Sequence, residues 1–171
     1  MSPDYTPTEF TADVVEIRNQ PDGPGLRYGK HGEATALARL LPGGAELIRS
    51  RIGQFQAESR YWEGRIGTVH QLRIIIINND DQALITVTYD GDFIPYLGDI
   101  VHEAGPWFDA LMKGAWAGYD SAGNPETQQM IVDSLVTAEM FYVHHHDLTV
   151  RDITRLKRLG GAVTELLDAA G

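Results

Sequence analysis

The clearest pattern in the chain is an apolar run that does not alternate with polar residues. Residues 68–78 contain four consecutive isoleucines, a residue type that favours strands. A strand that is apolar without alternation is typically covered on both faces. The run Asn78-Asn79-Asp80-Asp81 follows with turn-forming side chains, and residues 83–89 form a second apolar stretch. This region therefore predicts a β-hairpin.

Apolar periodicity on either side of the hairpin predicts the remaining elements. A spacing of three and four residues indicates helices, and short apolar stretches bounded by Gly, Pro, Asn or Asp indicate strands. In chain order we predict a strand over 34–41, a helix over 45–57, the two hairpin strands, a helix over 93–116, a short helix over 126–136, a strand over 139–146 and a helix from 150 onward. Asp92 and Thr149 precede the second and the last of these helices, where we expect them to act as N-caps.

The order of these elements predicts an α+β fold. It is β-α-β-β-α-β, the split plan of ferredoxin-like domains with an antiparallel sheet. Residues 1–33 are rich in proline, glycine and charge around a strand-like patch at 14–17, and we assign them to an N-terminal arm. Residues 34–171 form one ferredoxin-like domain that ends in a helix. Because helices cover one face of such a sheet, a second copy of the chain is expected to cover the other, as a homodimer or higher symmetric oligomer enclosing a barrel.

Composition narrows the range of partners. The chain has 171 residues, a net charge of −10 with His taken as neutral, and no cysteine. The acidic balance does not suit nucleic acid, and the absence of cysteine excludes disulfides and thiol catalysis. The longest apolar run, residues 74–77, is far too short for a membrane helix, and the first ten residues lack the pattern of a signal peptide. We expect a cytoplasmic protein without nucleic-acid or membrane partners.

Two short motifs give the chain a resemblance to a known superfamily. Thr68-x-His70-x-x-Arg73 leads into the isoleucine strand, and Tyr89-Asp90-Gly91-Asp92 follows the second hairpin strand. With the predicted order of elements, they resemble the dimeric α/β-barrel superfamily, in particular bacterial members with an H-x-x-R strand and an F/Y-D-G turn. That superfamily includes haem peroxidases, chlorite-dismutase-like proteins, cofactor-free monooxygenases and ligand-binding modules. The resemblance implies a cavity that handles a small molecule or haem.

His70 and Arg73 are the first candidate site residues. They are three apart on a strand, so they are expected to point to opposite faces. A buried arginine needs a carboxylate partner, and Asp90 or Asp92 is the expected one after the hairpin reverses. Such a pair would anchor the turn. In the alternative, Arg73 would hold an anion or a substrate.

A cluster of histidines near the end of the chain is the second candidate. In His144-His145-His146-Asp147, alternation on the predicted strand places His144 and His146 on one face with Tyr142. Two imidazoles on one face can bind a metal, with Asp147 or His102 completing the site. The same residues can also form a polar strand end that meets water or a neighbouring subunit.

His102 is the third candidate, on the second predicted helix. The resemblance to haem-binding proteins implies a helix histidine as axial ligand, oriented by a carboxylate, and Asp99 is placed to be that carboxylate. The alternative is an exposed helix histidine beside an acidic neighbour.

Three functions remain open from the sequence. The first is an enzyme of oxygenase or peroxidase type, haem-dependent or cofactor-free, with His70, Arg73, Tyr142 and His144 as catalytic groups. The second is a non-catalytic haem-binding, small-ligand-binding or assembly module. The third is a metal-dependent lyase or cyclase that uses His144 and His146.

Overall fold

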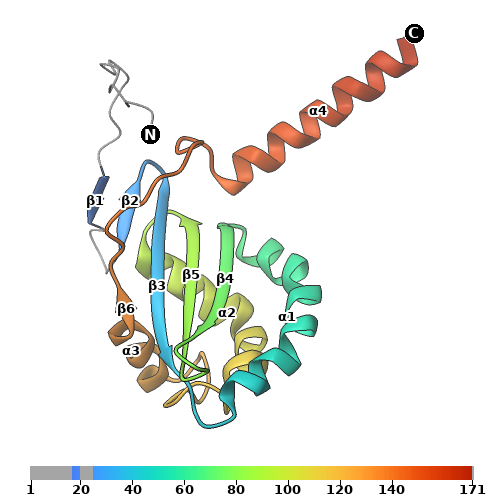
Figure 1. Cartoon of the computed structure of the whole chain (residues 1–171). Coiled ribbons are helices and arrows are strands. Elements are labelled where there is room, and N and C mark those ends of the chain that lie inside the picture. Colours follow the sequence, from blue (N-terminus) through green and yellow to red (C-terminus); the bar gives the residue numbers. More distant parts are fainter. Residues whose placement is uncertain (1–16, 20–24, 171) are drawn as a thin grey trace, which may run out of the picture.

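The chain forms an antiparallel sheet with helices packed on one of its faces (Figure 1). The computed structural model describes residues 17–19 and 25–170. In chain order the elements are β1 (Ile17–Asn19), β2 (Leu26–Tyr28), β3 (His31–Arg39), α1 (Gly44–Ile66), β4 (Val69–Ile77), β5 (Gln82–Asp90), α2 (Phe93–Met112), α3 (Pro125–Asp133), β6 (Leu135–Val136) and α4 (Val150–Ala170). The predictions of an α+β fold, an antiparallel sheet and a central hairpin are confirmed.

β3 is the centre of the sheet. The strands follow the order β1-β2-β3-β5-β4, and β6 pairs with β3 as well. Along one edge β3 pairs with β5 over its whole length, from His31 opposite Asp90 to Arg39 opposite Gln82. Its other edge is divided, with β2 beside its first residues and β6 beside Thr35 and Ala36. The register between β4 and β5 shifts at a β-bulge between Val69 and Gln71.

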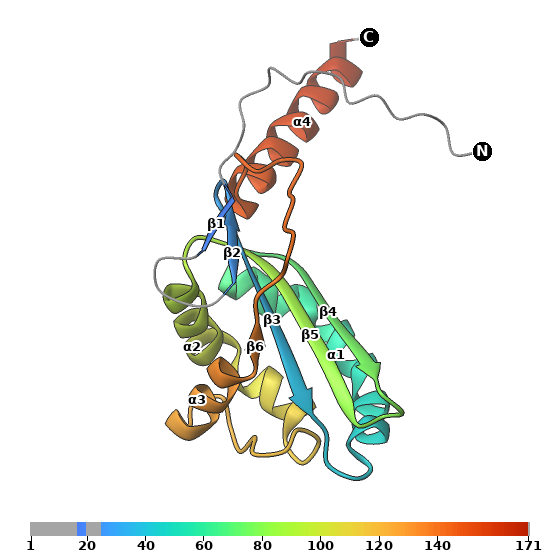
Figure 2. The same ribbon diagram turned by 60° about the vertical axis from the view of Figure 1, so that its left-hand side comes forward.

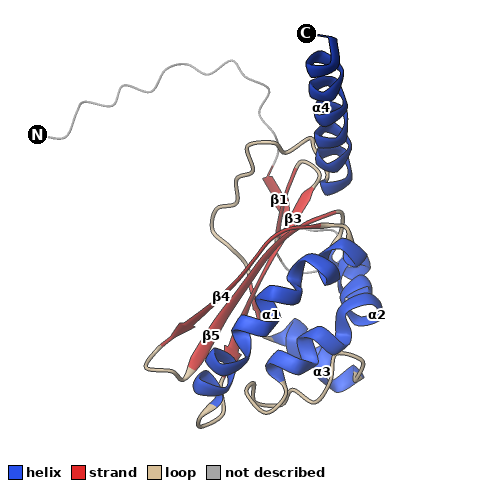
Figure 3. Ribbon diagram, turned by 90° about the vertical axis from the view of Figure 1, so that its right-hand side faces the viewer, coloured by secondary structure: helices blue, strands red, loops and turns tan. Residues whose placement is uncertain are grey.

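The hydrophobic core lies between the sheet and the helices α1 and α2 (Figure 3). Three alanines of β3 face this side, at positions 34, 36 and 38. Their small side chains leave room for large rings from the helices. The stacked pair Phe55 and Trp107, with ring centroids 3.9 Å apart, fills part of this space.

The opposite face of the sheet is open within the chain. Ile74 and Ile76 pack against the core, whereas Ile75 is 42% exposed on the other side. By register, three cross-strand rows follow one another on the open face: Leu37–Leu84–Ile75, Thr35–Thr86–Arg73 and Glu33–Thr88–Gln71. The chain itself therefore covers the isoleucine run on one face only. Because two of the three rows on the open face are polar, that face does not have the composition of a dry core.

The strand predicted over 139–146 is absent, and this part of the prediction is wrong. Only Leu135 and Val136 pair with β3, and the segment from 137 to 149 is a loop with a turn at 144–147. The reason lies at the edge of β3, where β2 already pairs with β3 and its Arg27 lies opposite Gly32. A strand that continued from β6 would find that position occupied.

Other boundaries shift by smaller amounts. α1 runs nine residues past the predicted end at Ala57 and closes at Gly67, whose φ of 69° is left-handed and whose N–H donates to the carbonyl of Glu63. α2 ends at Met112, before the predicted Trp116. The predicted boundary between residues 33 and 34 falls inside β3. Of the patch at 14–17, residues 14–16 lie outside the described residues and Ile17 begins β1.

The last helix, α4, projects away from the sheet (Figures 1 and 2). Thr149 caps it as predicted, because its hydroxyl accepts from the N–H of Asp152 at 3.1 Å, and the Asp152 carboxylate accepts from the Thr149 N–H at 3.0 Å. No residue of α4 is buried. None of the described helices is both long enough and apolar enough to cross a lipid bilayer.

Candidate functional site

Three titratable side chains meet at the end of the sheet where β3 begins and β5 ends. His31 and Asp90 are register neighbours, so their side chains leave the sheet on the same, open face. His70 lies in the β-bulge of β4, which brings its ring to the same side. The rings of His31 and His70 meet edge to face, with centroids 4.3 Å apart.

Asp90 is the centre of this cluster. Its Oδ1 lies 2.6 Å from Nε2 of His70 and 3.5 Å from Nε2 of His31. Its Oδ2 accepts a hydrogen bond from the backbone N–H of Val150 at 2.8 Å. One carboxylate therefore joins both imidazoles to the first residue of α4.

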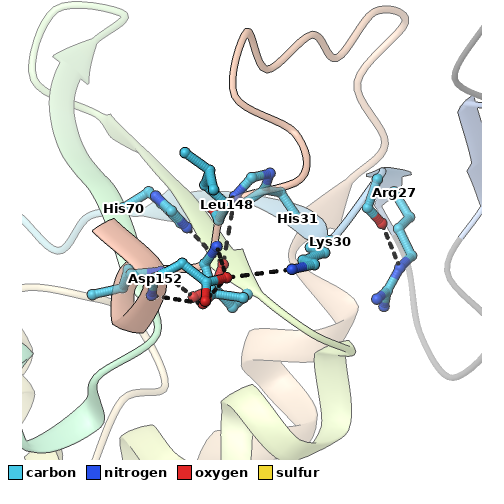
Figure 4. Close-up of polar contacts among 10 residues, drawn as sticks. Arg27, Lys30, His31, His70, Leu148 and Asp152 are labelled. Atoms are coloured by element: carbon cyan, nitrogen blue, oxygen red, sulfur yellow. Dashed lines mark hydrogen bonds and ion pairs between the residues drawn. The ribbon is translucent and has the colours of Figure 1, made fainter. Parts of the chain in front are cut away.

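His31 is fully buried, and its ring is held by the loop that precedes α4 (Figure 4). Its Nε2 lies 3.0 Å from the carbonyl oxygen of Leu148. Within the described part of the chain its Nδ1 is buried without a hydrogen-bond partner. Burial and the neighbouring His70 lower the pKa of His31 from its usual 6.5. The lowered pKa favours the neutral ring, and when Nε2 donates to the Leu148 carbonyl the Nδ1 atom carries a free lone pair.

The basic residues around the cluster are already paired with other carboxylates. Lys30 Nζ lies 3.3 Å from Asp152 (Figure 4). Arg27 forms an ion pair with Asp92. Asp92 is the N-cap residue of α2 as predicted, but its carboxylate makes no capping hydrogen bond. The carboxylate of Asp90 is therefore left to the two histidines and the α4 amide.

The loop before α4 closes tightly over the turn between β2 and β3. The backbone N–H of Lys30 donates to the carbonyl of His146 at 2.9 Å. Gly29 has a left-handed φ of 60°, and a Cβ at this position would collide with that same carbonyl. His146 is close enough to His31 for its charge to contribute to the lowered pKa of His31. The close approach keeps the cluster away from bulk water.

His31, His70 and Asp90 form the group of side chains that can hold a metal ion among the described residues. The ligand atoms that they offer all lie within 4.8 Å of one another. Two imidazoles and a carboxylate are a donor set that divalent transition metals accept. The Leu148 carbonyl lies 3.0 Å from Nε2 of His31, the same nitrogen that lies 3.5 Å from Asp90, so an ion bound through this nitrogen would replace that hydrogen bond.

Arg73 lies apart from this cluster, so the predicted pairing with Asp90 or Asp92 is wrong. Those carboxylates bind His70 and Arg27, as described above. Arg73 is exposed on the open face opposite Thr86, at a hollow of about 160 Å³.

The histidines near the end of the chain are not aligned on a strand, and that premise is wrong. His144 Nδ1 lies 3.2 Å from the hydroxyl of Tyr142, and both side chains are exposed on the loop. The His146 ring packs against Tyr28 with centroids 5.4 Å apart. Asp147 is exposed beside them. The catalytic role predicted for Tyr142 and His144, and the metal role of His144, His146 and Asp147, stay predictions.

His102 is exposed on α2, and its Nδ1 lies 2.9 Å from the carbonyl of Gly98, one turn earlier. The partner of this nitrogen is therefore the helix backbone, where Asp99 was expected. An apolar cavity of about 90 Å³ lies between the sheet, α2 and α3, and His102 does not line it. Such a volume is far below that of a porphyrin. The haem role of His102 and Asp99 stays a prediction.

His31 was missed by sequence reasoning because it was assigned to the N-terminal arm. The available signal was the turn-like Gly29-Lys30 followed by His31 and an apolar alternating stretch. Extending the predicted strand back by three residues brings His31 level with Asp90 once β3 pairs with β5.

Comparison with known proteins leaves the cluster to be interpreted from its own geometry. No protein-family model, curated protein or solved structure matches the chain. The resemblance to the dimeric α/β-barrel superfamily, drawn from the motifs around His70 and Asp90 and the order of elements, therefore stays a prediction.

The lowered pKa of His31 predicts how stability changes with pH in metal-free protein. In the unfolded chain the His31 ring binds a proton near pH 6.5, whereas in the folded chain it binds one only at lower pH. The free energy of unfolding should therefore fall as the pH is lowered from about 6.5 through the folded-state pKa. Urea unfolding in the presence of a chelator measures this slope. His31→Gln should flatten it and His102→Gln should not, so equal slopes in the two variants would contradict the assignment.

Proposed function

We propose that the chain is a metal-dependent enzyme that acts on a small molecule at the open face of its sheet, with His31, His70 and Asp90 as the metal ligands. The observation that carries the proposal is the convergence of these side chains within 4.8 Å at one end of the sheet. Two of them are mostly or fully buried, and the third is a histidine only partly exposed. A buried group of this kind is costly unless a proton or an ion satisfies it.

The donor set favours an oxidation among the reaction classes. Two histidines and one carboxylate leave coordination positions open, and with iron(II) this is the ligand set of non-haem oxygenases. The same set also accepts zinc, manganese or cobalt. Nε2 of His70 and Oδ1 of Asp90 share a hydrogen bond of 2.6 Å, which a bound ion would replace.

The hollow on the open face supplies a place for the substrate. Its walls include Gln71 and Thr88, which form the row next to His70 and Asp90, about 7 Å along the strands. The loop adds Met140 and Phe141 to the rim. Arg73 stands one row further, about 13 Å from the cluster. This arrangement suits a small apolar or aromatic molecule whose acidic group binds Arg73.

The finer architecture is part of the same proposal. The order β6-β3-β5-β4 supports the ferredoxin-like plan, although β6 has only two residues. A second copy facing the open side would close the hollow into the barrel that the superfamily resemblance implies. Its polar rows would then line a ligand cavity.

Metal binding is the direct test of the proposed centre. Protein purified without a histidine tag and stripped with a chelator is titrated with iron(II), zinc, manganese(II) and cobalt(II), followed by elemental analysis. We expect one equivalent of at least one of these ions per chain. His70→Ala should weaken binding by about 100-fold because it removes one ligand of three. Cobalt(II) should also give a visible absorption band that the variant lacks.

His102→Ala is the matched control, because His102 is an exposed histidine outside the cluster. It should bind the ion like the unmodified chain. Substoichiometric binding of all four ions, or equal loss in both variants, would reject the metal centre.

A second candidate function follows from the same 2.6 Å contact. Without a metal, Asp90 orients the His70 ring through this contact, so the pair could act as a general base in cofactor-free oxygenation or another proton abstraction. Failure of the metal titration with an intact His70–Asp90 contact would favour this function.

A further inference from the structure

The helix α4 presents an apolar face that its own chain leaves uncovered. Five large apolar residues on it are between 52% and 70% exposed, at positions 156, 159, 163, 166 and 167. The helix projects beyond the sheet in both views (Figures 1 and 2). An exposed apolar face of this length is a mark of an interaction site.

These residues form one continuous stripe. Ile153, Leu156, Gly160, Val163, Leu167 and Ala170 follow one another at alternating intervals of three and four residues. This is the seam spacing of a helix that pairs with another helix. Leu159 and Leu166 lie along one edge of the seam and widen it. The spacing therefore favours a helical occupant over a flat surface.

The charges of α4 are divided between its two halves. Residues 150–159 carry four basic side chains, Arg151, Arg155, Lys157 and Arg158, against one acidic side chain, Asp152. Residues 161–170 carry Glu165 and Asp168 and no basic side chain. A parallel copy of the helix would place basic beside basic, whereas an antiparallel copy places each basic half beside an acidic half. Antiparallel pairing also opposes the two helix dipoles.

We propose that α4 is the contact between two copies of this chain, which pair through an antiparallel α4–α4 interface. In one register every seam position finds a seam partner: Ile153 with the second copy's residue 170, Leu156 with residue 167, and Gly160 with residue 163. The edge residue Leu159 falls level with the second copy's residue 164, about 3 Å along the helix from the edge residue at 166. The same register sets the second copy's Asp168 level with Arg155 and its Glu165 level with Arg158.

Gly160 gives separate support for a helix as the occupant. Glycine inside a helix costs about 1 kcal/mol relative to alanine. A Cβ at position 160 would meet no atom of its own chain within 4 Å, so packing within the chain does not require glycine there. In the antiparallel register Gly160 faces a valine of the second copy near the middle of the pair. There the missing side chain lets the two backbones approach closely.

Disulfide trapping tests the register, and the chain suits it because it has no cysteine of its own. Leu156→Cys and Leu167→Cys are prepared separately, one of them isotope-labelled throughout, then mixed and oxidised mildly. The antiparallel pair predicts the mixed disulfide in about tenfold excess over either self-disulfide. The reason is that residue 156 of one copy lies about 16 Å along the helix axis from residue 156 of the other copy. Intact mass of the products measures the ratio.

The control pair, Thr154→Cys and Ala169→Cys, lies at the same level along the two helices but on their outer faces. It should give little mixed disulfide. Dominant self-disulfides at position 156 would show a parallel pair and overturn the proposal. Equal trapping by seam and control pairs would show random collision and overturn it as well.

The mass of the assembly gives an independent test. At about 100 µM, Leu156→Glu should have half the mass of the unmodified assembly by light scattering, with an unchanged circular dichroism spectrum apart from α4. Because no residue of α4 is buried in the chain, this variant leaves the folded body intact. A monomeric unmodified chain, or an assembly whose mass Leu156→Glu leaves unchanged, would refute the α4 interface. Neither result decides whether the proposed metal centre forms.

Discussion

Replacing Trp107 with alanine is expected to lower the free energy of unfolding by about 3 to 5 kcal/mol, the largest loss we foresee for a single core residue. The indole is 2% exposed and lies parallel to the ring of Phe55, with an angle of 5° between their planes. Its Nε1 donates to the carbonyl of Phe55 at 3.0 Å. The variant would leave a large cavity between α1 and α2 and a buried carbonyl without its partner.

Chemical denaturation followed by circular dichroism measures this loss. Tyr61→Ala is the control, since Tyr61 is an aromatic residue of α1 with 62% of its surface exposed. That change should stay within about 0.5 kcal/mol of the unmodified chain. A loss below about 1 kcal/mol for Trp107→Ala would mean that the packing between α1 and α2 is not the main source of stability.

Asp90→Ala is the second change with a large expected effect, about 3 kcal/mol in the metal-free protein. It removes the acceptor of His70 and the acceptor of the Val150 N–H in one step. Because this carboxylate is only 10% exposed, water cannot fully replace it. The amide of Val150 should then exchange with solvent at least tenfold faster, because a lost hydrogen bond of about 1.4 kcal/mol corresponds to that factor.

Asp92→Ala is the matched control, two residues further along the chain. Its carboxylate is 42% exposed, pairs with Arg27 and makes no capping bond to α2. We expect a cost below about 1 kcal/mol and no change in exchange at Val150. If the two variants lost the same stability, Asp90 would not be the connection between the sheet and α4.

The parts of the fold that sequence patterns predicted are those set by local spacing. The isoleucine hairpin, the periodic apolar face of α2 and the Thr149 cap each depend on residues close together in the chain. α1 was predicted too short because residues 58–65 carry charged and aromatic side chains without a clear stripe, yet the helix continues to a glycine that can adopt a left-handed φ. The strand over 139–146 failed because its place beside β3 belongs to β2, which local sequence does not reveal.

The candidate site depended on contacts between distant residues, so only part of it was predicted. His70 and Asp90 were singled out by motif, but the sequence paired Asp90 with Arg73. A bulge of one residue decides that His70 reaches Asp90, and such a bulge leaves no clear mark in the sequence. His31 is 59 residues from Asp90 in the chain, and only the register of β3 with β5 brings them together.

The shared use of one carboxylate couples two events that would otherwise be separate. An ion that withdraws electron density from one oxygen of Asp90 changes how strongly the other oxygen holds the leading amide of α4. The coupling free energy is the same in both directions. If ion binding stabilises one orientation of α4, then fixing α4 in that orientation strengthens ion binding by the same amount. Because the α4 contact between two copies fixes the orientation of α4, dilution that separates the copies should change the affinity for the ion. The affinity for the ion should therefore depend on the concentration of the chain itself.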